Sequence, residues 1–125
     1  MSNKAVINTE KAPAAIGPYS QAVKAGNTVY LSGQIPLNPE TMEIVSDDFE
    51  AQARQVFTNL QAVCEEAAGS LGDIIKLNLY LVDLDNFAIV NKVMEEFFST
   101  PFPARAAVGV KALPKGSQVE AEAVM

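Results

Sequence analysis

One arginine stands among small and apolar residues near the end of the chain. The segment FPARAAVGV places Arg105 at the start of an alternating run, where it shares a strand face with Ala107 and Gly109. Those two residues leave space beside the guanidinium, which can hold a carboxylate through two parallel hydrogen bonds. Arg105 is therefore a candidate anion site. The alternatives are an edge-strand charge that discourages aggregation and an ion pair with an internal acid.

A glutamate in the segment SQVEAEAVM is the second candidate. Glu120 shares one face of this predicted strand with Glu122. If a tight turn at PKG pairs the segment with residues 105–112, Glu120 lies across from Gly109, about 13 Å along the strand from Arg105. The two side chains could then contact opposite ends of one small molecule. Glu120 could orient water and carry protons; the alternative is a solvated glutamate on an edge strand.

Three further positions could contribute to a ligand site. Tyr19 follows the stiff segment IGP, so it either faces a cleft or packs its loop onto the sheet. Ser32 and Gly33 interrupt a good strand in YLSGQIP, which predicts a bulge or close approach by a ligand. Asn91 interrupts an apolar helical stripe, where an asparagine more often satisfies a backbone group.

Missing residue types exclude several chemistries. The chain has no histidine and one cysteine, Cys64, so an internal disulfide, a histidine-based triad and the common zinc sites are excluded. Cys64 lies on an apolar helical stripe and is expected to be a core residue. A metal held by carboxylates alone is the remaining metal chemistry, but the paired glutamates fall on expected helix surfaces. We therefore expect no metal site.

Length and charge limit the class of protein. The 125 residues, 49% of them hydrophobic, predict a single domain over 1–125 with a substantial core. Nine basic against 15 acidic residues give a net charge of −6, which disfavours nucleic acid as a partner. No stretch resembles a signal peptide or reaches the roughly 18 apolar residues of a membrane span. We expect a soluble, cytoplasmic protein without a membrane partner.

The elements that position these candidates follow from periodicity. Helical spacing predicts helices over 48–68, capped by Asp47 or Asp48 with Gly69 at C′, and over 83–98, capped by Asp83 or Asp85. Alternation predicts strands over 5–9, on both sides of the turn Gly26-Asn27, from 75 to 81, and in a second hairpin formed by 105–112 and 117–125.

This order of elements favours an α+β fold with both helices on one face of the sheet. The other face would leave small and apolar side chains exposed, among them Tyr30, Ala107, Gly109 and Val124. An obligate oligomer that packs sheet against sheet would cover them. Clefts between such subunits are natural sites for a small ligand.

Taken together, the segments APAAIGPYSQAV, VYLSGQIP, EAQARQVFTNLQAV, DNFAIVN and FPARAAVGVKALPKGSQVEAEAV resemble the RidA/YjgF family over nearly the whole chain. The resemblance implies a chorismate-mutase-like α+β fold, with a mixed sheet, and a homotrimer whose sheets form a central barrel. It also implies three ligand sites at subunit interfaces. The implied activity is hydrolysis of reactive enamine or imine intermediates, such as 2-iminobutanoate and 2-iminopropanoate, to 2-oxo acids and ammonia.

Matching positions in the family imply roles for individual residues. Arg105 would bind the substrate carboxylate, and Glu120 would position water and transfer protons. The remaining substrate-binding positions would be Tyr19, Ser32, Gly33, Phe87, Asn91 and Ala107. Many family members have cysteine where this chain has Ala107, so a thiol mechanism is excluded and that position would act through its backbone. An iminium carbon is already electrophilic, so the reaction needs no metal and no cofactor.

Two other functions stay open on the sequence. The same pocket could hold 2-oxo acids in a non-catalytic binding or regulatory protein. A ribonuclease or translation-inhibitor role, attached to some relatives, is disfavoured by the acidic charge and the lack of histidine.

Overall fold

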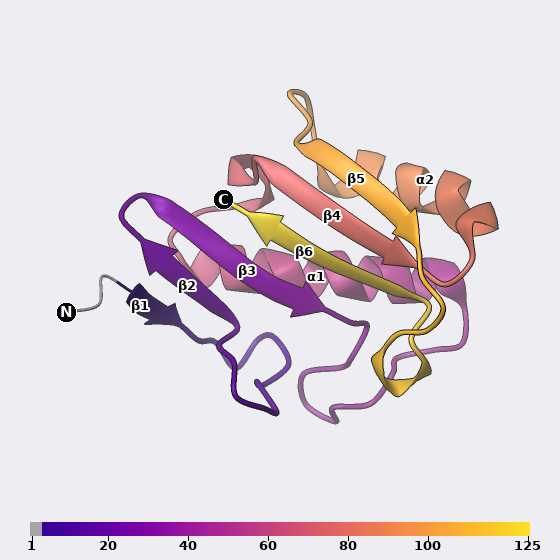
Figure 1. Ribbon diagram of the computed structural model, residues 1–125, viewed down its shortest axis with the longest axis horizontal. Coiled ribbons are helices and arrows are strands. Elements are labelled where there is room, and N and C mark those ends of the chain that lie inside the picture. The colour runs from indigo at the N-terminus through magenta and orange to yellow at the C-terminus, as the bar shows by residue number, and fades with distance from the viewer. Residues whose placement is uncertain (1–3) are drawn as a thin grey trace.

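A six-stranded mixed sheet organises the computed structural model, which describes residues 4–125 (Figure 1). Its order is β1-β2-β3-β6-β4-β5. The strands are β1 Lys4–Ile7, β2 Ala22–Ala25, β3 Thr28–Gln34, β4 Lys76–Leu81, β5 Ala104–Gly109 and β6 Val119–Val124. The helices α1 (Phe49–Glu66) and α2 (Phe87–Phe97) lie behind one face of the sheet, as Figure 1 shows. The predicted α+β class is confirmed, and residues 1–3 of the predicted domain lie outside the described residues.

The N-terminal strands form the predicted hairpin. β2 and β3 pair antiparallel, with Ala25 opposite Thr28 across the turn. Gly26 has φ 60°, a left-handed conformation that glycine adopts without a Cβ penalty. β1 extends the sheet by pairing antiparallel with β2, slightly earlier in the chain than the predicted 5–9.

Helix α1 begins as its sequence predicts. The Asp48 carboxylate accepts a hydrogen bond from the Ala51 amide at 3.0 Å, which satisfies one of the free donors of the first turn. The predicted apolar stripe is buried at Phe49, Ala53, Val56, Phe57, Leu60, Val63 and Cys64.

The end of α1 differs from the prediction. Ala68, not Gly69, adopts the left-handed conformation, with φ 64°. The Gly69 amide donates to the Cys64 carbonyl at 2.9 Å, which completes a Schellman-type end. A Cβ on Gly69 would lie 2.9 Å from the Met125 methyl group and 2.9 Å from Asp73 Oδ2, so these two side-chain ends would have to shift to admit it.

The predicted C-terminal hairpin is wrong. β5 pairs parallel with β4 at the edge of the sheet, whereas β6 lies between β3 and β4 and is antiparallel to both. Parallel neighbours need a crossover connection, and α2 provides it between β4 and β5. The chain then turns back through the 3₁₀ turn Pro114–Gly116 before it enters the sheet centre as β6.

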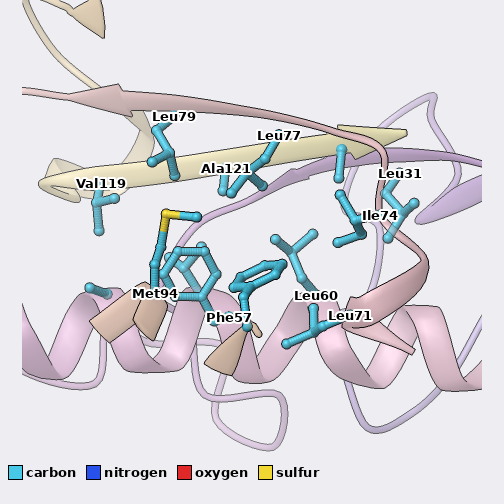
Figure 2. Packing of buried hydrophobic residues seen from close by; sticks show 14 of the residues in the cluster. Leu31, Phe57, Leu60, Leu71, Ile74, Leu77, Leu79, Met94, Val119 and Ala121 are labelled. Atoms are coloured by element: carbon cyan, nitrogen blue, oxygen red, sulfur yellow. The ribbon is translucent and has the colours of Figure 1, made fainter. Parts of the chain in front are cut away.

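The core fills the space between the sheet and the two helices (Figure 2). Leu77 and Leu79 of β4 face Phe57 and Leu60 of α1, and all four are almost fully buried. Burying a side chain of this size contributes about 2 kcal/mol to the free energy of folding. Cys64 is also fully buried, which confirms the core interpretation, and this burial raises the pKa of its thiol to about 12.

The face of the sheet away from the helices carries exposed apolar side chains. Tyr30 is 52% exposed and Val108 is 46% exposed. The prediction that Ala107 belongs to this face is wrong: Ala107 pairs with Leu79 of β4, so its side chain lies on the helix side, and Gly109 pairs with Leu81 in the same way. Within residues 4–125, neither helix has the length and apolarity that crossing a membrane requires.

Candidate active site

A cavity of about 520 Å³ opens where the end of β3 meets β6, and we call it the Glu120 cavity. Four of the predicted site residues line it: Tyr19, Ser32, Gly33 and Glu120. The rest of its wall comes from the loop before β2, the segment around the end of β3, the 3₁₀ turn and β6: Pro13, Ala14, Ile16, Gln34, Ile35, Leu37, Pro114, Lys115 and Glu122. Its volume suits a small molecule.

The wall formed by β3 is bulged. The pairing of β3 with β6 shifts register within residues 31–34, as the interruption at Ser32 and Gly33 predicts. A Cβ on Gly33 would collide with the Glu120 carboxylate, so the group that approaches the glycine closely is this carboxylate. The Ser32 hydroxyl donates to the Ser20 carbonyl at 2.6 Å and ties the bulge to the neighbouring loop.

A buried glutamine fixes the loop that carries Tyr19. The Gln21 side chain accepts from the Thr9 amide at 2.8 Å and donates to the Pro13 carbonyl at 2.8 Å. Tyr19 is half exposed and lines the cavity. The sequence reasoning missed Gln21; its only signal is an amide directly before a strand, beside a loop rich in proline and alanine.

The Glu120 carboxyl is half-buried against β3. Burial raises its pKa, and the negative charge of Glu122 two residues along β6 raises it further. A carboxyl group whose pKa lies above its ordinary value is a stronger base when ionised, and this suits a role in proton transfer.

Arg105 lies on the edge strand β5, and its side chain contacts three residues of α2. Its Nη1 donates to Asn91 Oδ1 at 2.6 Å and lies 3.3 Å from the Met94 sulfur. The guanidinium carbon sits 4.9 Å from the centre of the Phe87 ring. Asn91 thus accepts from Arg105 and does not serve a backbone group.

No acid neutralises this guanidinium among residues 4–125. The ion pairs of the described chain join Arg54 and Lys92 to Glu50 and Glu96 on the helices, and Arg105 takes part in none of them. The sequence left open an ion pair between Arg105 and an internal acid, and the described residues contain no such pair. Arg105 is exposed and lines a second cavity of about 470 Å³ with Asn91, Met94, Glu95, Phe102 and Pro103, which we call the Arg105 edge.

The Glu120 cavity and the Arg105 edge are separate within one chain. Arg105 pairs with Leu77 and so points to the helix side, whereas Glu120 pairs with Tyr80 and points to the open face. The predicted placement of Glu120 opposite Gly109 is wrong, because β4 lies between β5 and β6. The structure thus forms two groups: Tyr19, Ser32, Gly33 and Glu120 in one, and Phe87, Asn91 and Arg105 in the other. Ala107 lines neither cavity and packs partly buried against the core.

Residues 9–125 match the model of a family described as Endoribonuclease L-PSP. Among solved structures, RidA from the Antarctic bacterium Psychrobacter sp. PAMC 21119 has a TM-score of 0.94 and 57% identity, covering 97% of this chain and 98% of that one. The chain belongs to the RidA/YjgF/L-PSP family. The family resemblance read from the sequence motifs is confirmed.

Curated RidA-family relatives match over their full length. A 2-iminobutanoate/2-iminopropanoate deaminase of Dermatophagoides farinae is 49% identical over 125 residues, which is 100% of this chain and 98% of the relative. The protein of the same name from Escherichia coli (strain K12) is 49% identical over 121 residues, 94% of each chain. The structure of E. coli TdcF with bound serine has a TM-score of 0.89 and 42% identity, covering 97% of each chain.

The RidA fold brings side chains to the Glu120 cavity that the sequence reasoning left without a role. Lys115 lines it because the PKG turn folds against the segment after β3, where Lys115 Nζ donates to the Met42 carbonyl at 3.2 Å. Glu122 lines it because strand alternation places it on the face of Glu120. The sequence QVEAEAV shows this alternation. It does not show that β3 lies beside β6 and completes the wall of the cavity.

Acidic side chains do not converge on a cation position in the described part of the chain. Within residues 4–125, no group of three or more cysteine, aspartate or glutamate side chains is arranged to hold a metal ion.

Proposed function

We propose that this chain hydrolyses 2-iminobutanoate and 2-iminopropanoate to the corresponding 2-oxo acids and ammonia. The observation that carries the proposal is its match to relatives of that name over essentially its full length at 49% identity. The two cavities support it, because they offer a free cation for the carboxylate of an imino acid and a carboxyl group suited to proton transfer.

The proposed reaction adds water across the carbon–nitrogen double bond. The substrate reacts as its protonated imine: the water oxygen bonds to C2, the π electrons move to nitrogen, and Glu120 takes a proton from the water. Glu120 then returns that proton to the amino group of the neutral carbinolamine, which becomes an ammonium leaving group. The C–N bond breaks with its electron pair going to ammonia, and the hydroxyl proton passes to Glu120 and on to solvent as the C=O bond of the 2-oxo acid forms.

Arg105 is the proposed anchor of the substrate carboxylate. Asn91 takes one N–H of the guanidinium and Phe87 lies against it, and this leaves the other donors of the fork for a carboxylate. Fixing the carboxylate fixes the position of C2 relative to the attacking water, which is a large part of the catalytic advantage of a bound substrate.

The remaining predicted site residues complete the proposed pocket. Tyr19 and Phe87 would wall it, and Ser32, Gly33 and the backbone at Ala107 would offer polar contacts to the substrate. The bulge supports this role for Gly33, since it exposes the backbone beside the Glu120 carboxylate.

Because one chain keeps Arg105 and Glu120 apart, we propose that the complete site forms between subunits of a homotrimer. The exposed apolar side chains of the open face, such as Tyr30 and Val108, support an assembly that packs sheet against sheet. Each site would then take Glu120 from one subunit and Arg105 from its neighbour.

A coupled assay tests the proposed activity. A pyridoxal-phosphate-dependent dehydratase generates the imine, and semicarbazide competes for it while ammonia release is followed. The purified protein should accelerate ammonia release and lower the yield of semicarbazone. An unchanged semicarbazone yield at micromolar protein would contradict the deaminase proposal.

A non-catalytic binder of small amino or 2-oxo acids is the second candidate. The observation that favours it is the related TdcF structure with bound serine. Saturable binding of 2-oxobutanoate in calorimetry, together with an unchanged semicarbazone yield, would support this candidate over the enzyme.

A further inference from the structure

A second carboxylate faces the Glu120 cavity. Glu122 follows Glu120 by two residues on β6, so the two side chains leave the same face about 7 Å apart along the strand. Both line the same cavity. In one small site, two carboxyl groups repel each other when both are ionised.

Two donors on the neighbouring strand hold Glu122 in place. The Tyr80 hydroxyl donates to Glu122 Oε1, and Asn78 Nδ2 donates to the same oxygen at 3.4 Å. The register explains this contact, because Asn78 stands directly opposite Glu122 and Tyr80 opposite Glu120. The hydrogen bond to Glu122, together with burial, raises the pKa of Tyr80 to about 12, so its hydroxyl stays a donor at neutral pH.

Few ionisable groups face Glu120 from the elements around it. Glu122 stands on its own strand, Tyr80 on β4, Tyr19 on the loop before β2 and Lys115 on the 3₁₀ turn. β3 contributes only Ser32, Gly33 and Gln34, which do not titrate in this range. Apart from burial, the charge of Glu122 is the cause that raises the pKa of Glu120.

We propose that Glu122, held by Tyr80 and Asn78, is a positioning residue that makes Glu120 a stronger base. The inference rests on the proposed hydrolysis, in which Glu120 takes a proton from water. In this role Glu122 acts through Glu120 and not on the substrate. It fixes a negative charge on one side of Glu120 and thereby favours proton uptake by the carboxylate that does react.

The Glu122→Gln variant tests this inference because it removes the charge and keeps the shape. The acid limb of kcat/KM should move to lower pH, since Glu120 stays ionised to a lower pH once the neighbouring charge is gone. At pH 7 kcat should fall about threefold, because Glu120 is then a weaker base. Tyr80→Phe should move the limb in the same direction but less, because an unanchored Glu122 turns its charge toward solvent.

A matched control separates the pair from a general change in charge. Glu66→Gln removes one carboxylate charge at the exposed end of α1, outside the lining of the Glu120 cavity, and it should leave the acid limb in place. An acid limb that stays in place, or moves to higher pH, in Glu122→Gln would overturn the proposal. A shift in Glu122→Gln with none in Tyr80→Phe would overturn the anchoring role of Tyr80.

A second measurement does not depend on turnover. A carbon-13 NMR titration of glutamate-labelled protein, with the Glu120 resonance assigned from Glu120→Gln, should show Glu120 titrating at lower pH in Glu122→Gln than in the wild type. If the wild type proves inactive while this shift is present, the proposed hydrolysis fails and the coupling of the two carboxyl groups stands. If the wild type is active and the shift is absent, the coupling alone fails.

Discussion

The Glu120 cavity and the Arg105 edge hold their charged groups in opposite ways. Glu120 is half-buried, pressed against the bulged backbone of β3 and beside a second carboxylate. Arg105 is exposed on an edge strand, where an amide oxygen and an aromatic ring orient it. The surroundings of Glu120 raise its pKa. The surroundings of Arg105 fix the orientation of its guanidinium without neutralising the charge.

This difference shows how the proposed chemistry is divided in the molecule. Proton transfer benefits from a carboxyl group with a raised pKa, which requires burial and a nearby like charge. Carboxylate binding benefits from a rigid cation without a counter-ion, which requires neutral partners. One chain provides both surroundings but on opposite faces of the sheet, which is why the proposed site combines two copies of the chain.

The strongest test of the comparison removes the cation. Arg105→Ala should lower kcat/KM at least about 100-fold, because the substrate loses the anchor that positions its C2 atom. Arg54→Ala removes the same charge from the helix surface, at a position that lines neither cavity, and should retain near-normal turnover. Light scattering and circular dichroism check that both variants keep their assembly and fold. Near-normal turnover in Arg105→Ala would exclude it as the anchor.

Mixing two inactive variants tests whether the two regions work together across subunits. The Arg105→Ala and Glu120→Gln variants, each expected to be inactive alone, are unfolded together and refolded at equal concentration. Random assembly gives intact sites at about one quarter of the interfaces, so activity should return to about a quarter of the wild-type value. A mixture as inactive as its parents would assign both residues to one chain.

A smaller effect is expected from adding one methyl group to the bulge. Gly33→Ala places a Cβ against the end of the Glu120 side chain, which is flexible enough to turn away. We expect about a tenfold loss of kcat with a change of less than about 1 kcal/mol in the free energy of unfolding. Gly72→Ala, at an exposed position where the new Cβ would meet only the Ser70 hydroxyl in ordinary contact at 3.4 Å, serves as the matched control. A Gly33→Ala enzyme with wild-type kcat would show that the position of Glu120 is not critical.

The smallest effect concerns stability. Because the pKa of Glu120 is raised in the folded state, its ionised form destabilises the fold above that pKa, and this cost vanishes at low pH where the group is protonated in both states. Glu120→Gln should therefore be more stable than the wild type at pH 8, by less than about 1 kcal/mol, and equal to it near pH 3. Urea unfolding at one protein concentration measures this difference. A variant that is less stable at pH 8 would contradict the raised pKa.

Much of the fold could be predicted because local periodicity carries the information. The stripe of α1 and its Asp48 cap depend on residues within one or two turns of each other, and both are present as predicted. The turn at Gly26 and the bulge at Gly33 are local in the same sense, since each depends on a residue without a Cβ. Alternation also grouped Arg105 correctly with Ala107 on one strand face.

The neighbours of each strand could not be predicted in this way. Alternation states which residues share a face, but it does not state which strand lies beside which, and a short turn at PKG falsely favoured a hairpin. The parallel placement of β5 depends on the α2 crossover, and the central place of β6 depends on burying Val119 and Ala121 between sheet and helices.

The sequence by itself determined the family, the elements and the residue types that could bind a carboxylate and move a proton. Only the tertiary structure decided that Arg105 faces the helix side and Glu120 the open side, with β4 between them. The physical reason is that a side-chain pattern of period two is the same for either face of a sheet. The face that becomes buried is chosen by packing against α1 and α2, which are distant in sequence.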